Sequence, residues 1–287
     1  MIVVTGATGH VGKQVAELLA ERRKPLRLLV RDKARAPSLD AELAVADYAD
    51  SRAMIAAFDG AETAFIVSAS APPGERARLH ASAFDAAKKA RVKHVVYLSL
   101  AGAAPSSPYP YARDHHESER ALLATGLDCT IVRNGKYTEQ LLEPSLLGLG
   151  EDATLRAPDG SAKVAWISRA DTARVLAHLL EAPPGGVVQP TGPEAPTLLE
   201  TAERLARALD RQITFVEETL EELRERALAT AKDRGAAALW IGSIAAIAAG
   251  EYEPVDDAAR FIEQSESLED TVSSGVLDAL RTTRTVG

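Results

Sequence analysis

The first twelve residues carry glycines at the spacing of a phosphate-binding loop. Gly6, Gly9 and Gly12 come directly after the apolar run 2–4. Such glycines let the chain turn sharply off a strand, admit a pyrophosphate close to the backbone and allow a helix to pack tightly on the strand. The helix start that follows offers free N–H groups and the positive end of its dipole. The loop therefore predicts a bound dinucleotide. The expected contacts are Gly6, Thr8, Gly9, His10, Val11 and Gly12.

The end of the next predicted strand indicates which dinucleotide is bound. Arg31 follows that strand, and residues 33 and 35 are also basic. A guanidinium can hold a 2′-phosphate through two hydrogen bonds, whereas an NAD-specific site usually has a carboxylate here. We therefore expect NADPH, although Asp32 leaves NADH open and the basic stretch also fits a solvated loop. Further cofactor contacts are expected at the ends of later strands, from Asp47 and Ser68.

Short apolar runs alternate with amphipathic stretches along the first half of the chain. This alternation predicts an α/β fold, a Rossmann-type doubly wound parallel sheet. The nearly continuous apolar strands fit a sheet covered on both faces. The predicted strands span 2–5, 26–30, 43–46, 64–68, 94–99 and 129–132. The predicted helices span 11–22, 51–58, 75–90 and 113–125.

The regular alternation ends near residue 135, which predicts a domain boundary. We expect a Rossmann domain over 1–135 and a smaller α/β substrate lobe over 136–287. Short strands are expected near 163–167, 187–190 and 213–216, with a helix over 197–209. Ser168 suits a helix N-cap, and the helix over 169–182 is expected to pack back on the first domain.

Composition excludes several classes of function. The 287 residues carry a formal charge of −8, which argues against general nucleic-acid binding. The single cysteine rules out an intrachain disulfide, and no Cys/His spacing indicates a metal. The most apolar stretch, 236–249, is shorter than the roughly 20 residues of a membrane span. We expect a cytoplasmic protein, and a homodimer stays open.

The region after the fifth predicted strand raises the question of catalysis. Short-chain dehydrogenases/reductases carry Tyr-x-x-x-Lys there, and this chain has no such pair. On a helix, His115 and Glu119 share one face, so the carboxylate could orient the imidazole and make it more basic. The alternative is a charged, solvated helix face.

Several stretches together resemble the NmrA-like atypical short-chain dehydrogenase/reductase family, and most of all its type-2 NAD(P)H:quinone oxidoreductases. They are residues 5–12, 47–48, 114–120 and, most specifically, 133–139. The resemblance implies that Asn134, Gly135 and Tyr137 lie under the nicotinamide and that Ser99 and His115 face the same cleft. Two residues depart from the family pattern: Lys136 stands where an aromatic residue is common, and His116 is an additional histidine.

These observations favour an NADPH-dependent oxidoreductase that transfers hydride to a quinone or a similar conjugated acceptor. Such an acceptor delocalises the incoming charge and needs positioning more than a strong acid. His115 and Tyr137 are the expected catalytic residues. The expected substrate contacts are Ser99, Tyr137, Trp240 and Ile244, the last two from an apolar helix over the pocket. The rival hypotheses are an NADP(H)-sensing regulator without turnover and a sugar-nucleotide epimerase. The tyrosine–lysine pair that such an epimerase needs is missing from this chain.

Overall fold

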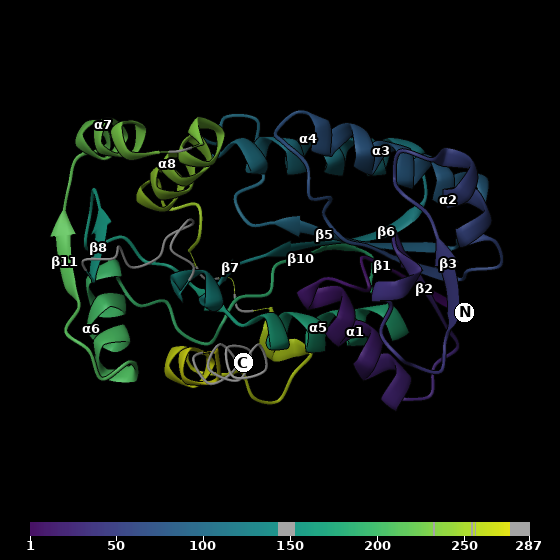
Figure 1. The fold of residues 1–287 in the computed structure, drawn as a ribbon. Helices are drawn as coiled ribbons and strands as arrows, with labels where there is room; N and C mark the ends of the chain where they lie inside the picture. The colour runs from purple at the N-terminus through teal and green to yellow at the C-terminus, as the bar shows by residue number, and fades with distance from the viewer. Residues whose placement is uncertain (143–152, 232, 254, 256, 276–287) are drawn as a thin grey trace.

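A seven-stranded sheet forms the centre of the computed structural model (Figure 1), which describes residues 1–142, 153–231, 233–253, 255 and 257–275. Its strands are β1 (Ile2–Thr5), β2 (Leu26–Val30), β3 (Glu42–Val45), β4 (Thr63–Ile66), β5 (His94–Leu100), β6 (Asp128–Asn134) and β10 (Gly186–Val188). They lie in the order β10-β6-β5-β4-β1-β2-β3, and every pair is parallel. The direction of winding reverses between β1 and β4. In open α/β sheets, ligands bind at the carboxyl ends of the strands beside such a reversal.

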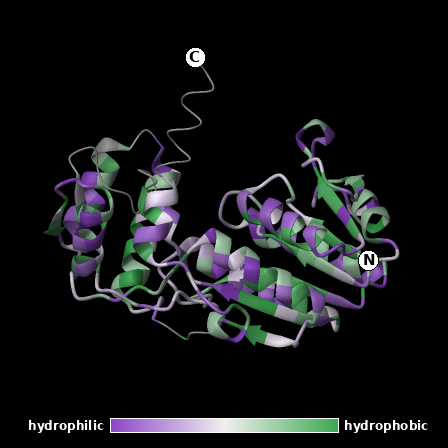
Figure 2. Ribbon diagram, turned by 90° about the horizontal axis from the view of Figure 1, so that it is seen from below, coloured by the Kyte–Doolittle hydropathy of each residue, from purple (hydrophilic) through white to green (hydrophobic). Residues whose placement is uncertain are grey.

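Helices cover both faces of this sheet, as Figure 1 shows. On one face lie α1 (His10–Glu21) and α5 (Arg169–Glu181). On the other lie α2 (Ser51–Phe58), α3 (Glu75–Lys89) and α4 (Pro110–Thr125). The alternation of strand side chains joins the layers: Val4 packs toward α1 and α5, and Val3 packs toward α2 and α3. The strands are consequently hydrophobic along most of their length, as Figure 2 shows.

Side-chain caps fix where two of these helices begin. The Asp50 carboxylate accepts a hydrogen bond from the Ala53 N–H at the start of α2. The Ser168 hydroxyl accepts one from the Asp171 N–H at the start of α5, which confirms the predicted cap. Each cap satisfies a backbone donor that has no partner within its helix.

The smaller lobe lies beyond β7, at the left of Figure 1. The short strands β7 (Lys136–Tyr137) and β9 (Trp166–Ile167) pair in parallel, as do β8 (Thr154–Ala157) and β11 (Thr214–Glu217). Its helices are α6 (Leu198–Ala208), α7 (Leu220–Thr230) and α8 (Arg234–Ala248). The described residues also form the 3₁₀ turns η1 (Lys33–Arg35), η2 (Thr138–Leu142) and η3 (Ala258–Arg260) and a helical segment over 268–275. A separate core beneath α8 includes Leu141, Trp166 and Tyr252.

Two elements from the second half of the chain belong with the first. The strand expected near 187–190 is β10, and it extends the main sheet beside β6 rather than lying in the smaller lobe. Helix α5 packs beside α1, and its apolar side chains share a core with β1 and β2. The strand β8 had no counterpart among the sequence predictions. No helix in the described part of the chain is long and apolar enough to cross a membrane.

Candidate functional site

A groove of about 390 Å³ opens at the carboxyl ends of β1 and β4. All six predicted loop residues, from Gly6 to Gly12, line it. So do Arg31, Asp47 and Ser68, the residues predicted at the ends of β2, β3 and β4. The structure thus brings these predicted contacts together at the point where the sheet reverses direction.

Two of the loop glycines, Gly6 and Gly12, stand where the packing leaves no room for a side chain. Gly6 has φ +61°, and a Cβ built there would lie 2.4 Å from Cγ1 of Val67. A Cβ at Gly12 would lie 2.3 Å from the carbonyl oxygen of Gly6. The Gly9 N–H donates to that same carbonyl at 2.9 Å, which closes the turn. This compact turn places the amino end of α1 at the groove, where its N–H groups can bind a pyrophosphate.

Tyr48 ties the two central strands together under the groove. Its hydroxyl donates to the Val67 carbonyl at 2.9 Å and lies 2.6 Å from the Thr5 hydroxyl. The Val67 N–H in turn donates to the Thr5 hydroxyl at 3.0 Å. Burial raises the pKa of Tyr48, so its hydroxyl stays a donor. Tyr48 was not among the predicted contacts, although its pairing with Asp47 was part of the family resemblance.

A second cavity, of about 230 Å³, adjoins the groove. Ser68, Leu98 and Tyr137 line both spaces, so the two meet at these side chains. Other residues predicted for the catalytic end lie around the second cavity: Ser99, His115, Asn134 and Gly135. We call this space the acceptor cavity.

A buried histidine beside His115, His80, has a defined tautomer. The Ala69 N–H donates to Nε2 of His80 at 2.8 Å, so the ring proton of His80 is on Nδ1. Nδ1 lies 2.8 Å from the Ser118 hydroxyl and 3.0 Å from the Tyr97 hydroxyl. Burial lowers the pKa of His80 to about 3, so the ring is neutral. Nδ1 of His80 therefore cannot accept a hydrogen bond from the Tyr97 hydroxyl.

The Tyr97 hydroxyl, which is hydrogen-bonded to Ser118, also contacts His115. The two side chains are joined by a 2.9 Å hydrogen bond between the Tyr97 hydroxyl and Nδ1 of His115. In the tautomer in which Nδ1 accepts this bond, the proton of His115 lies on Nε2, which is 3.4 Å from the Ser68 hydroxyl. Burial lowers the pKa of His115 well below its ordinary value. His115 is thus a neutral imidazole beside the acceptor cavity.

The expected pairing of His115 with Glu119 is wrong. Both Glu119 oxygens are bonded to Arg133, at 3.0 and 2.6 Å, and one accepts from the Ser99 hydroxyl at 2.5 Å. The guanidinium of β6 competes for the carboxylate because its two N–H groups fit both oxygens. His115 is oriented instead by a tyrosine on β5.

Lys136 is buried at the far wall of the acceptor cavity. Its ammonium donates to the Ser243 hydroxyl of α8 and lies 4.7 Å from the ring centres of Tyr109 and Tyr252. Burial lowers the pKa of Lys136 to about 7, against the opposing effect of Glu251. Lys136 therefore places a titratable cation at the cavity.

The lining residues without a predicted site role include one cation and two aromatic side chains: Arg76, Tyr109 and Tyr111. The Arg76 guanidinium carbon lies 3.6 Å from the centre of the Tyr111 ring, and the two tyrosine rings meet edge to face at 5.6 Å. The tyrosines stand at the start of α4, in the segment 109–120 that drew attention for the missing Tyr-x-x-x-Lys. Arg76 lies at the start of α3, and no local sequence pattern points to it as a site residue.

The comparisons with known proteins agree with this geometry. A family model described as NAD(P)H-binding matches residues 6–183. The chain belongs to this NAD(P)H-binding, NmrA-like family.

Its similar relatives extend over most of the chain. The NAD(P)H azoreductase of Xenophilus azovorans is 34% identical over 230 residues, which cover 78% of this chain and 79% of the relative. Quinone oxidoreductase 2 of Escherichia coli (strain K12) is 34% identical over 222 residues, covering 75% and 77%. A crystal structure of the NADPH-dependent quinone oxidoreductase QOR2 from E. coli, complexed with NADPH, matches with a TM-score of 0.85 at 29% identity and covers 96% of this chain and 99% of that one. The fold prediction is thereby confirmed, and this family member binds NAD(P)H.

Neither Trp240 nor Ile244 lines the groove or the acceptor cavity, in contrast to the predicted roof. Ile244 is buried in the core of the smaller lobe. Trp240 packs against the same core, with the Arg226 guanidinium of α7 lying 5.3 Å from its ring. Since α7 covers this side of α8, the helix reaches the cavity wall through Ser243 instead.

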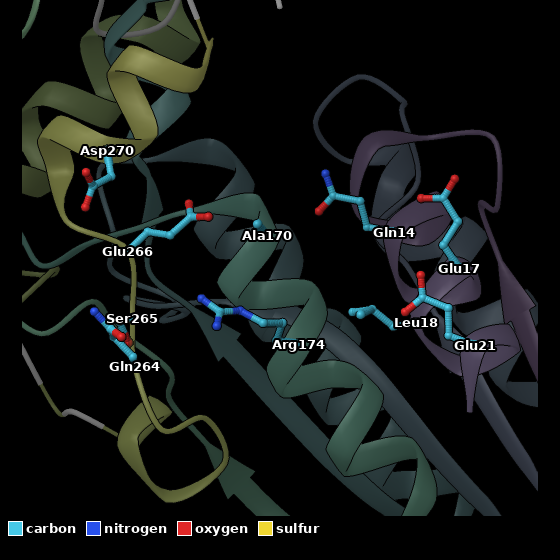
Figure 3. Close-up of a pocket in the computed structure, with 10 residues that line it drawn as sticks. All are labelled: Gln14, Glu17, Leu18, Glu21, Ala170, Arg174, Gln264, Ser265, Glu266 and Asp270. Atoms are coloured by element: carbon cyan, nitrogen blue, oxygen red, sulfur yellow. The ribbon is translucent and has the colours of Figure 1, made fainter.

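A larger cavity, of about 630 Å³, lies between α1, α5 and the segment 264–270 (Figure 3). It shares no lining residue with the groove or the acceptor cavity. Its ionisable side chains are Glu17, Glu21, Glu266, Asp270 and Arg174. This acidic lining disfavours the phosphates of a dinucleotide, so the groove remains the cofactor site.

Proposed function

We propose that this protein is an NADPH-dependent oxidoreductase that transfers hydride to a quinone or a similar conjugated acceptor. The observation that carries the proposal is the junction of the groove with the acceptor cavity at Ser68, Leu98 and Tyr137. The named activities of the azoreductase and of quinone oxidoreductase 2 support the same reaction class.

The groove fits a dinucleotide on the evidence of its own backbone. Gly6 and Gly12 leave no room for a Cβ, and the space beside them is open. In this proposal the turn and the start of α1 hold the pyrophosphate, and Arg31 holds the 2′-phosphate, which favours NADPH over NADH. When bound there, the cofactor supplies the hydride.

The acceptor cavity positions the acceptor and supplies hydrogen-bond donors. In this proposal His115 carries its ring proton on Nε2 and directs it toward the Ser68 hydroxyl. Burial raises the pKa of Tyr137, which keeps its hydroxyl protonated at the junction. We assign both side chains to holding an acceptor oxygen or nitrogen as charge develops on it. Such donors suffice for an acceptor that delocalises charge, and solvent delivers the final protons.

An acceptor screen tests this function. NADPH oxidation is followed by its absorbance with 1,4-naphthoquinone, 1,4-benzoquinone and an azobenzene dye, beside a control without acceptor. We expect turnover with at least one quinone, and a higher kcat/KM with NADPH than with NADH. A protein that binds NADPH but oxidises it with none of these acceptors would overturn the proposal and favour a sensing role.

A further inference from the structure

The charge of the acceptor cavity is opposite to that of the whole protein. The chain has a formal charge of −8. Yet the described residues that line this cavity include two cationic side chains, Arg76 and Lys136, and no aspartate or glutamate. The cavity in Figure 3 shows the contrary pattern, with four carboxylates and one arginine. A positive cavity in an acidic protein favours an anionic occupant.

Arg76 is held in place but retains hydrogen-bonding capacity. Its guanidinium stacks on the Tyr111 ring at 3.6 Å, and Nη1 donates to the Ser68 hydroxyl at 3.0 Å. Its Nε is buried and has no hydrogen-bond partner. Within the described part of the chain, no carboxylate forms an ion pair with Arg76. A buried donor without a partner is costly, and a guanidinium is matched to a planar or tetrahedral oxyanion.

Arg76 lies close to the end of the cavity that meets the cofactor groove. Ser68, which accepts its hydrogen bond, also lies 3.4 Å from Nε2 of His115 and lines the cofactor groove. Tyr109 and Tyr111 provide aromatic surface at the same cavity. An aromatic acceptor with an acidic substituent meets both features, since its ring is placed against tyrosine and its oxyanion against guanidinium.

The positive charge of Arg76 depends less on pH than that of Lys136. Burial lowers the pKa of Lys136 to about 7, so its charge is partly lost at neutral pH. The ammonium of Lys136 is also already bonded to the Ser243 hydroxyl. A guanidinium stays charged throughout the range in which proteins are folded. Recognition of an anion therefore depends mainly on Arg76.

We propose that the acceptor cavity selects conjugated acceptors that carry a sulfonate or carboxylate substituent, and that Arg76 binds this group. The inference rests on the proposed reductase function and names the acceptor class within it. Arg76 acts here as a specificity-determining residue, and hydride transfer itself needs no further group.

A matched pair of acceptors tests the proposal. Initial rates are measured with 1,4-naphthoquinone-2-sulfonate and with 1,4-naphthoquinone, for the wild type, Arg76→Leu and Arg78→Leu. Arg78 is an exposed residue of the same helix, paired with Glu75, so its replacement changes the net charge equally. Comparing the two acceptors within each variant cancels their different intrinsic reactivity.

We expect Arg76→Leu to lower kcat/KM for the sulfonated quinone about tenfold more than for the neutral quinone, the effect of a charge-assisted hydrogen bond. Arg76→Lys should restore part of the preference. An equal loss for both quinones, or the same selective loss in Arg78→Leu, would overturn the assignment. Melting curves identify any variant that fails to fold, and Arg76→Gln then replaces Arg76→Leu.

A binding measurement separates this inference from the function on which it rests. Naphthalene-2-sulfonate, which cannot be reduced, is titrated by calorimetry into the protein saturated with NADP⁺, with naphthalene-2-sulfonamide as the neutral control. Binding of the sulfonate that is lost in Arg76→Leu and kept in Arg78→Leu supports the anion site even if no quinone is reduced. Quinone turnover with sulfonate binding unaffected by Arg76→Leu overturns the anion site and leaves the reductase function standing.

Discussion

The cofactor groove and the acceptor cavity share three side chains but are built differently. The groove is formed by one compact turn and the ends of adjacent strands, and its shape depends on the missing side chains of Gly6 and Gly12. The cavity is lined by large side chains from α3, α4, β5, β6 and β7. Backbone geometry thus determines the first space, and distant side chains determine the second. Substitutions in the groove should therefore affect all reactions, whereas substitutions in the cavity should discriminate among acceptors.

The largest expected effect is the loss of NADPH affinity after a substitution in the cofactor groove. In Gly12→Ala, the new methyl group would lie 2.3 Å from the Gly6 carbonyl oxygen, so the loop must shift. We expect NADPH affinity, measured by fluorescence titration, to fall about 100-fold. Gly235→Ala is the control, because Gly235 lies in α8, lines neither space, and a Cβ there would be 3.2 Å from its nearest atom, Oδ1 of Asp233. Wild-type affinity in Gly12→Ala would refute the role of the tight turn.

A smaller and more selective effect is expected at the edge of the groove. Arg31→Ala removes the cation assigned to the 2′-phosphate and should weaken NADPH binding about 30-fold, within the range of a charge-assisted hydrogen bond. NADH binding should change less than about twofold. Lys33→Ala is the control, since Lys33 does not line the groove. Equal losses of both cofactors in a titration would show that Arg31 does not read the 2′-phosphate.

In the cavity, His115→Ala should slow the reaction without loosening the cofactor. Removing the Nε2–H donor is expected to lower kcat about tenfold, while the Kd for NADPH stays within about twofold. The neighbouring His116→Ala is the matched control, because His116 lines neither space. Steady-state rates equal to those of the wild type would remove His115 from the catalytic residues.

The smallest effect concerns stability and its dependence on pH. Burial lowers the pKa of Lys136 from 10.5 to about 7, so between these values the unfolded chain binds more protons than the folded one. The free energy of unfolding therefore rises as pH increases from 7 toward 10.5. The penalty of burying the charged Lys136 ammonium is greatest below pH 7. Lys136→Met should raise the Tm by about 4–8 °C at pH 6, roughly 2 kcal/mol, and less at pH 9.5.

Thermal melts at the two pH values check this expectation. Lys89→Met serves as the control, because Lys89 is an exposed residue of α3 paired with Asp85. A gain in Tm that does not change with pH would indicate better packing by methionine rather than relief of a buried charge.

The difference between the two regions also explains what could be predicted from the sequence. The turn of residues 5–12 and the basic residue after β2 are local patterns, and the structure places both at the groove. The main strands were predicted to within about two residues at each end for the same reason. The cavity, in contrast, is formed by residues that are far apart in the sequence. Arg76 is 35 residues from Tyr111 along the chain, and no sequence periodicity relates them.

The two wrong expectations have a common cause. Glu119 lies one helical turn from His115, but the Arg133 guanidinium on a neighbouring strand binds it. Trp240 lies on an apolar helix, but α7 covers that side of it. In both cases the helix pattern was read correctly, and a tertiary neighbour that the pattern does not contain decided the contact.

The return of α5 and β10 to the first half of the fold has a consequence for protein engineering. These elements interrupt the smaller lobe in sequence, since the chain leaves the main sheet after β6, comes back for residues 169–188 and leaves again before α6. A chimera made by one cut at residue 135 would remove an edge strand from the sheet and uncover the apolar side of α1. Transplanting a different acceptor specificity therefore requires two separate inserts, over 136–165 and 191–256, with α5 and β10 kept from the recipient.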